Sequence, residues 1–183
     1  MTSHNSRFYD EGSDIWFGDF DASDYFRIEE SEYYKRVLKH ERIKAVDCVL
    51  CQHKKNFTKI IFIEAKKNLH HVGKGTQNKI SSIAQQFLDS LYLICGCWLD
   101  INSSQISLPD GFSKYFNQGG QIEFTLVIKN CPKDILPLIM DDLGTKMKRE
   151  RLIWNFKIRA YNEELAAERN IVVLFRTPIS NPQ

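Results

Sequence analysis

The chain has 183 residues, of which 43% are hydrophobic and 26% are charged. This length suits one compact domain, and the apolar fraction excludes a disordered chain and a Gly- or Pro-rich fibre. The longest apolar run, residues 91–99, is too short to cross a membrane, and the polar, then acidic start does not resemble a signal peptide. Five cysteines, an odd number, argue against a secreted disulfide framework. We therefore expect a soluble, cytoplasmic domain without a membrane partner.

Charge is divided unevenly along the chain, although the total is only +2. Residues 1–32 hold nine acidic side chains and two arginines, which gives −7, and residues 33–183 carry +9. A body of this charge suits a polyanion such as nucleic acid. Ordinary surface lysines and arginines explain the same excess, so charge alone does not identify a partner.

Residues 1–27 form an acidic, aromatic arm whose pattern differs from that of the remaining chain. Its aromatic side chains alternate with acidic and small residues and follow neither a helical nor a strand period. We expect an irregular arm whose aromatic side chains dock on a single α/β domain formed by residues 28–183. The aromatic candidates for docking are Phe8, Tyr9, Trp16, Phe17 and Phe20.

Several segments of the domain carry apolar residues at helical spacing. In the first of them, Glu30 shares a face with Val37 and Leu38. The second has the broadest apolar stripe of the chain, and a fourth, short helix follows Asn162, a residue type that caps helices. Helices are therefore expected at residues 29–41, 80–98 and 134–147 and directly after Asn162.

Strand patterns alternate with these helices. Two apolar runs rich in Ile, Val and Phe are separated by a polar turn, which predicts a hairpin, and later segments alternate apolar with polar residues. A hairpin followed by alternating elements indicates an α/β domain with a mixed central sheet. The basic segment 66–79 and residues 101–120 are interpreted as loops. Strands are expected at residues 43–50, 57–63, 122–128, 154–160 and 171–175, with Trp154 in the core.

The residues that carry chemistry lie in and after the predicted hairpin. Asp47 interrupts the first apolar strand, and Glu64 and Lys66 end the second. Burial of a carboxylate costs free energy unless a cation compensates it. Because side chains in a strand alternate with a period of two, Glu64 and Lys66 share a face, and pairing of the strands lets Asp47 face the same side. Two carboxylates and one ammonium are therefore expected to converge at one edge of the sheet.

Such a group suits metal-assisted hydrolysis of a phosphodiester. Mg²⁺ is held in proteins by one or two carboxylates together with water and phosphate oxygens. The metal lowers the pKa of its water and neutralises charge at the phosphate, and a nearby lysine orients or deprotonates that water. The competing interpretation is a surface ion pair at a strand end, with Asp47 as a polar edge residue.

Asp47 followed by Glu64-Ala65-Lys66 at a strand end resembles the signature of the PD-(D/E)XK nuclease superfamily. The resemblance covers roughly residues 28–130, and Val46 replaces the proline of the motif. It implies a restriction-endonuclease-like fold, a mixed central sheet flanked by helices. It also implies Asp47 and Glu64 as ligands of Mg²⁺ or Mn²⁺ and Lys66 as the catalytic lysine.

The same family often adds a glutamate from its first helix. Glu30 is our candidate for this role, and Glu29 and Glu32 are close competitors. The resemblance further implies a nuclease that acts on DNA rather than RNA, and many nucleases of this kind act as homodimers because cutting two strands needs two sites. The spacing of Tyr92 does not fit the helical Gln-x-x-x-Tyr pattern of some members, so the subfamily stays open.

The basic segment beside this group supplies candidate nucleic-acid contacts, which are Lys67, His70, His71, Lys74 and Lys79. These side chains suit binding to phosphates, and a solvated loop explains them equally well. A zinc site made by the cysteines is a weaker alternative, because most of them fit the pattern of small core residues. A further alternative to the enzyme is a catalytically silent nuclease-fold module that binds nucleic acid or a partner protein.

Overall fold

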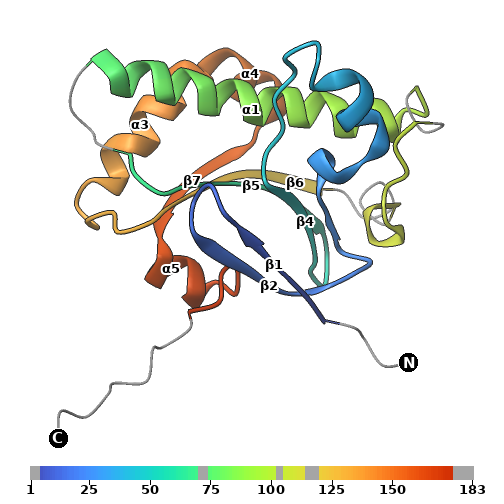
Figure 1. The fold of residues 1–183 in the computed structure, drawn as a ribbon, viewed down its shortest axis with the longest axis horizontal. Helices are drawn as coiled ribbons and strands as arrows, with labels where there is room; N and C mark the ends of the chain where they lie inside the picture. Colours follow the sequence, from blue (N-terminus) through green and yellow to red (C-terminus); the bar gives the residue numbers. More distant parts are fainter. Residues whose placement is uncertain (1–4, 70–73, 102–104, 114–119, 175–183) are drawn as a thin grey trace, which may run out of the picture.

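The computed structural model describes residues 5–69, 74–101, 105–113 and 120–174. Its centre is a five-stranded mixed sheet in the order β3-β4-β5-β6-β7, and a separate antiparallel pair, β1-β2, packs against one face (Figure 1). The described strands are β1 (Asn5–Asp10), β2 (Ile15–Asp21), β3 (Tyr25–Phe26), β4 (Cys48–His53), β5 (Thr58–Lys66), β6 (Gly120–Ile128) and β7 (Lys157–Asn162).

Helices cover both faces of the central sheet. The described helices are α1 (Lys74–Trp98), α3 (Leu136–Lys146), α4 (Lys148–Trp154) and α5 (Glu163–Glu168). α1, α3 and α4 lie on one face, and the β1-β2 hairpin and α5 lie on the other (Figure 1). In the described ranges, no helix has the length and hydropathy needed to span a membrane.

The sheet combines an antiparallel and a parallel half. β3, β4 and β5 pair antiparallel, as the predicted hairpin requires, whereas β5, β6 and β7 pair parallel. Parallel neighbours need a crossover, and the chain makes the two crossovers through α1 and through α3 with α4. The carboxyl ends of the three parallel strands therefore lie at the same end of the sheet. Glu64 and Lys66, at the end of β5, lie there as well.

Alternation along the strands divides the interior into two apolar layers. Ile60 and Phe62 of β5 belong to the layer under α1, where the rings of Phe87 and Phe124 lie 4.9 Å apart. Ile61 of β5 belongs to the opposite layer, under the β1-β2 hairpin. Because Glu64 and Lys66 continue the series of Ile60 and Phe62, their side chains leave the sheet on the α1 side.

The expected irregular arm is instead a β-hairpin followed by a short strand of the central sheet. Its aromatic docking is confirmed for Phe8, Phe17 and Phe20, which are buried, whereas Tyr9 and Trp16 form an outward-facing pair. The strand period is hidden in the sequence because the register shifts between Ser6 and Arg7.

Gly18 allows this irregular register. Its φ is +149°, and a Cβ at this position would lie only 2.6 Å from the side chain of Arg7. A larger residue would therefore clash with the facing strand in a backbone conformation that favours glycine.

The first predicted helix is shorter and more irregular than its spacing indicates. The chain forms a 3-10 turn at Ile28–Glu30 and a π-helical segment at Tyr34–Leu38, where the N–H of Lys39 donates to the carbonyl of Tyr34 at 3.0 Å. The wider π turn changes which side chains share a face. Val37 is therefore 41% exposed, and Glu30 points away from the core.

Three later expectations also need correction. The basic segment 66–79 is not all loop, because α1 already begins at Lys74 with polar residues. Trp154 ends α4 and is 37% exposed, since the left-handed Asn155 separates it from β7. The last predicted strand is reduced to a single bridge between Phe17 and Val172. Helices α1, α3 and α5 and strand β6 confirm the corresponding predictions.

Candidate functional site

The β4-β5 register places Asp47, Glu64 and Lys66 together. Cys48 pairs with Ile63, so one further step of the same register sets Asp47 opposite Glu64 at the end of the ladder. The N–H of Ala65 donates to Oδ2 of Asp47 at 2.6 Å. The ammonium of Lys66 donates to Oε1 of Glu64, whose side chain is only 1% exposed. The sequence-predicted trio is thus one contiguous group.

Burial dominates the electrostatics of this group. Desolvation raises the pKa of Asp47 well above its ordinary value, and the charges of Glu64 and Asp10 add to the effect. Desolvation likewise raises the pKa of Glu64 from 4.5 to about 7, against the opposing effect of Lys66. For Lys66, desolvation opposes the charged form, but the attraction and hydrogen bond of Glu64 outweigh it and raise its pKa. The lysine is therefore cationic at neutral pH.

One carboxylate oxygen of the group lacks a hydrogen-bond partner. Oε2 of Glu64 is buried and accepts no hydrogen bond from any described residue. A side-chain hydrogen-bond interaction with Gln86 of α1 lowers the pKa of Glu64, although the Gln86 amide donates to the carbonyl of Ala45 at 3.3 Å and leaves Oε2 without a donor at full hydrogen-bond distance. Burial makes the charged form of this carboxylate costly, and a second cation beside Oε2 would stabilise it.

The donor set fits a hard divalent cation. Asp47 and Glu64 are the adjacent carboxylates that could hold it. Within the described residues, no group of three or more His, Cys, Asp or Glu side chains is arranged to hold a metal ion. Two carboxylates suffice for Mg²⁺, which commonly completes its shell with water and substrate phosphate oxygens.

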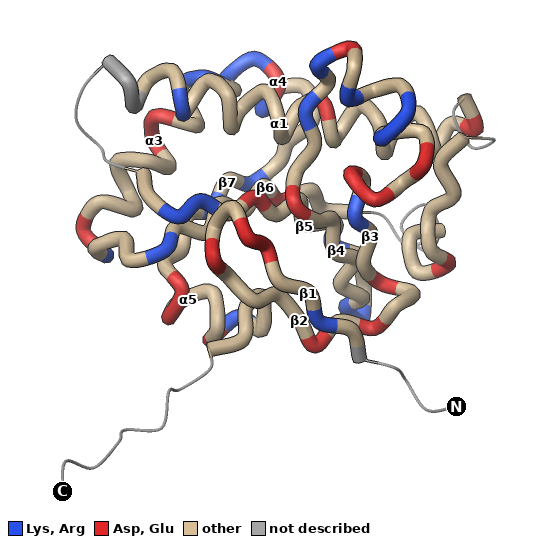
Figure 2. The backbone as a smooth tube through the Cα atoms, viewed as in Figure 1, with Lys and Arg blue, Asp and Glu red and all other residues tan. Residues whose placement is uncertain are grey.

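Asp10 is a neighbour that sequence reasoning missed. Its charge contributes to the raised pKa of both Asp47 and Lys66, and the N–H of Ser13 donates to its Oδ2 at 2.7 Å. The hairpin that carries Asp10 is fastened at this edge, because Nζ of Lys129 lies 2.6 Å from Oδ2 of Asp14. Figure 2 shows acidic residues in red along the β1-β2 hairpin.

The structure does not bring Glu30 into the group. Its exposed carboxylate pairs with Arg27. Its competitor Glu29 is the nearer acid, since its charge contributes to the raised pKa of Glu64 and it accepts a hydrogen bond from the hydroxyl of Tyr34 at 3.3 Å. Burial and then Glu29 raise the pKa of Tyr34 to about 12. Glu32 lies 3.9 Å from Lys35 on the surface.

The predicted phosphate contacts are only partly described. Lys67 is exposed directly after β5, and Lys79 is exposed on α1. Residues His70 and His71 and the side chain of Lys74 lie outside the described part of the chain. The structure therefore places two of the five predicted contact residues on the surface, one directly after β5 and one on the crossover helix α1.

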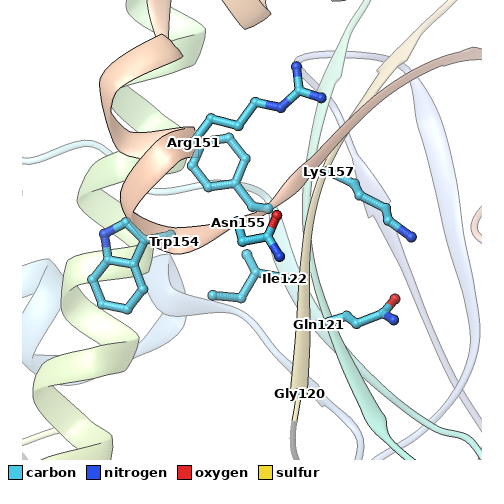
Figure 3. Close-up of a pocket in the computed structure, with 8 residues that line it drawn as sticks. Gly120, Gln121, Ile122, Arg151, Trp154, Asn155 and Lys157 are labelled. Atoms are coloured by element: carbon cyan, nitrogen blue, oxygen red, sulfur yellow. The ribbon is translucent and has the colours of Figure 1, made fainter.

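A pocket lies away from this group, at the end of the sheet where the parallel strands β6 and β7 begin. It has a volume of about 300 Å³ and is formed where β6 begins, between the end of α4 and the start of β7 (Figure 3). The labelled side chains that line it are those of Gln121, Ile122, Arg151, Trp154, Asn155 and Lys157. None of the residues predicted for the site contributes to it.

Comparison of the chain with protein-family models, with curated proteins and with solved structures gives no match in any of the three. The interpretation of the site therefore rests on the chemistry and geometry of its own residues.

Proposed function

We propose that this protein is a metal-dependent nuclease that hydrolyses phosphodiester bonds, with DNA as the expected polymer and the restriction-endonuclease-like fold as its family. The observation that carries the proposal is the pair Asp47 and Glu64, with a buried oxygen left unpartnered and the cationic Lys66 beside it. Two adjacent carboxylates that share one lysine carry excess negative charge when both are ionised, and a divalent metal ion stabilises such a pair.

In this proposal the carboxylates of the group bind the metal ion, and the neighbouring residues position them. Asp47 and Glu64 would hold Mg²⁺ or Mn²⁺, which supplies neutralisation of the scissile phosphate and a lower pKa for the attacking water. Asp47 is kept in place by the N–H of Ala65, and Asp10 and Glu29 add negative charge around the pair, which favours a cation. Burial keeps water from weakening these interactions.

Lys66 acts as a charged donor in this proposal. Because Glu64 raises its pKa, the lysine holds its proton at neutral pH and is not a neutral base in this arrangement. Its ammonium has three donors, of which one is used by Glu64. With 36% of its side chain exposed, it can donate to a phosphate oxygen or to the attacking water. The water oxygen bonds to phosphorus as the ester P–O bond breaks, the proton that the water loses reaches the leaving oxygen by way of solvent, and Lys66 stabilises the negative charge that develops on the phosphate oxygens.

The order of the secondary-structure elements agrees in outline with the core of the proposed family. A short helical segment, the β4-β5 hairpin, the crossover helix α1 and the parallel strand β6 follow one another. Between the helical segment and α1 the described residues form two strands, where the core of the family has three. The proposal therefore depends on the site rather than on the topology.

A cleavage assay tests the function directly. Supercoiled plasmid, linear duplex, single-stranded DNA and RNA are incubated with Mg²⁺ or Mn²⁺ and, in parallel, with chelator. Lys66→Ala and Asp47→Asn test the trio, and Glu30→Gln is a matched control because its carboxylate is exposed. We expect metal-dependent cutting that both site variants lose and the control keeps. Cutting in chelator, or full activity of Lys66→Ala, would contradict the proposal.

One observation favours a second candidate, the catalytically silent binding module. The described residues hold no group of three metal-ligating side chains, so the carboxylate pair is a minimal site. Thermal unfolding with and without Mn²⁺ distinguishes the two candidates. A nuclease should be stabilised by Mn²⁺ in a manner that Glu64→Gln abolishes, and a silent module should show no shift.

A further inference from the structure

The face of the sheet opposite α1 is only partly covered. The β1-β2 hairpin packs on β4, β5 and the end of β6, in the apolar layer that contains Cys48, Ile63 and Val127. Towards the edge strand β7, the same face changes character. Its outward positions are charged or polar there, and they include Lys59, Glu123, Thr125, Lys157 and Arg159.

Lys59, Glu123, Lys157 and Arg159 line a groove of about 480 Å³ along β7, which we term the β7 groove. α3 borders it with Leu136 and Met140, and α5 borders it with Leu165. Figure 1 shows β7 at the edge of the sheet, between these helices. The cations that line the groove are Lys59, Lys133, Lys157, Arg159 and Arg169, and the anion that lines it is Glu123.

Glu123 organises the cations on the floor of the groove. The carboxylate is 6% exposed, its Oε2 lies 2.7 Å from Nζ of Lys59 and 3.9 Å from Nε of Arg159, and its Oε1 accepts from the hydroxyl of Thr125 at 3.3 Å. The buried anion thus holds Lys59 closely and lies at the limit of ion-pair distance from Arg159, and the combined charge of the two cations exceeds its own. Positive charge held in this way is prearranged for an anionic ligand.

The chemistry of the lining favours a nucleic-acid strand. Lys157 is exposed and Arg159 is about half exposed, so their charges are available to phosphates. Arg169 lies over the ring of Tyr161, with its guanidinium carbon 6.0 Å from the ring centroid. A cationic groove beside an aromatic side chain is the combination that single strands use. A second copy of β7 would bring the same cations and be repelled.

We propose that the β7 groove binds the phosphate backbone of a nucleic-acid strand, at a site separate from the Asp47–Glu64–Lys66 group. The identity of the ligand rests on the proposed function, which this inference extends from the cleavage group to a substrate-binding surface. The register places Lys157 level with Ile61, five residues before Lys66 and two strands away, so the groove lies about 20 Å from the group and on the opposite face of the sheet. An oligonucleotide that reaches both places must therefore pass around the sheet.

Binding of a fluorescent single-stranded oligonucleotide in chelator tests this inference without cleavage. The test protein carries Lys157→Glu with Arg159→Glu, and the control carries Lys148→Glu with Arg149→Glu on the exposed face of α4, which changes net charge equally. We expect Kd to rise ~10-fold or more in the β7 variant alone, with a salt slope lower by about 0.7 for each lost phosphate contact. Lys157→Gln with Arg159→Gln repeats the test where charge reversal impairs folding.

Each outcome decides the inference. Equal weakening in both charge-reversed proteins, or no weakening in either, overturns it. A change of oligomeric state in the β7 variant by light scattering, without an effect on the oligonucleotide, assigns the groove to an acidic segment of a second copy and also overturns it. Binding that depends on the groove in a protein that never cleaves refutes the nuclease and keeps the groove. Cleavage with unchanged KM in the β7 variant refutes the role of the groove and keeps the nuclease.

Discussion

The central sheet contains two buried glutamates that each pair with a lysine of β5, one near each end of the strand. At the carboxyl end, Glu64 pairs with Lys66 and keeps its second oxygen unpartnered among the described residues. At the amino end, Glu123 pairs with Lys59 and engages both oxygens. A satisfied carboxylate holds its neighbours in place, whereas an unsatisfied one has capacity for another cation. This difference separates an organising glutamate from a candidate ligand.

The largest expected effect comes from removing the charge of Glu64. Glu64→Gln keeps the shape of the side chain but loses a metal ligand, so we expect the cleavage rate to fall by about 10³-fold. Glu123→Gln should leave kcat near that of the wild type. Plasmid cleavage under Mg²⁺ measures both variants. Equal losses would show that the two glutamates do not differ in function.

The second prediction concerns the pH dependence of stability in chelator. The pKa of Glu64 is raised from 4.5 to about 7 by burial, so the folded state binds more protons than the unfolded state between these values. Stability should therefore fall as pH rises through this window, by up to about 3 kcal/mol, and Asp47 contributes with the same sign. Denaturant unfolding at several pH values measures the slope.

Glu64→Gln should flatten that slope, since the group that takes up the proton is removed. Glu30→Gln serves as the matched control because Glu30 is exposed and paired with Arg27. A slope that persists unchanged in Glu64→Gln would assign it to other groups.

A smaller effect is expected for the stability of Glu123→Gln. The substitution leaves Lys59, which is 21% exposed, with a neutral partner, so unfolding should become easier by about 1–3 kcal/mol at neutral pH. In chelator at the same pH, Glu64→Gln should be neutral or stabilising. Urea unfolding of the two variants under the same conditions measures the difference in their free energies of unfolding. A destabilised Glu64→Gln would contradict the prediction.

The smallest predicted effect is that of Asp10. Asp10→Asn removes one of the charges that raise the pKa of Asp47, so the acid limb of the cleavage profile should move to lower pH by less than about one unit. Asp19→Asn is a control of the same type on the same hairpin, where the carboxylate pairs with Arg7. A shift in both variants would indicate a general charge effect.

The sequence predicts the trio because each step of the inference is local. A first apolar run that contains Asp47, a second run ended by Glu64 and Lys66, and one polar turn predict the hairpin and its faces, although the first strand begins at Cys48 and ends at His53 rather than covering residues 43–50. The cap at Asn162 is local as well, and its side chain accepts from the N–H of Leu165 at 3.0 Å. The family, the metal and the activity stay predictions.

Other features cannot be predicted from the sequence because tertiary contacts or irregular turns determine them. Asp10 reaches the site through the docking of a hairpin whose register shift hides its strand period. Helix α4 has no buried residue, so Leu152 and Ile153 provide no inward apolar period to detect. The choice between Glu29 and Glu30 depends on a 3-10 turn and a π-helical segment, whose widths differ from the assumed helix.

The fastening of the β1-β2 hairpin has a consequence for biosynthesis. Its partners come late in the chain: Lys129 holds Asp14, Phe17 bridges to Val172, and the N–H of Val173 donates to the carbonyl of Trp16 at 2.8 Å. During translation, the hairpin leaves the ribosome before these residues do, so the contacts with Lys129, Val172 and Val173 form only after those residues have emerged. The acidic border that the hairpin adds to this end of the sheet is therefore secured later than the β4-β5 pairing that brings Asp47 and Glu64 together.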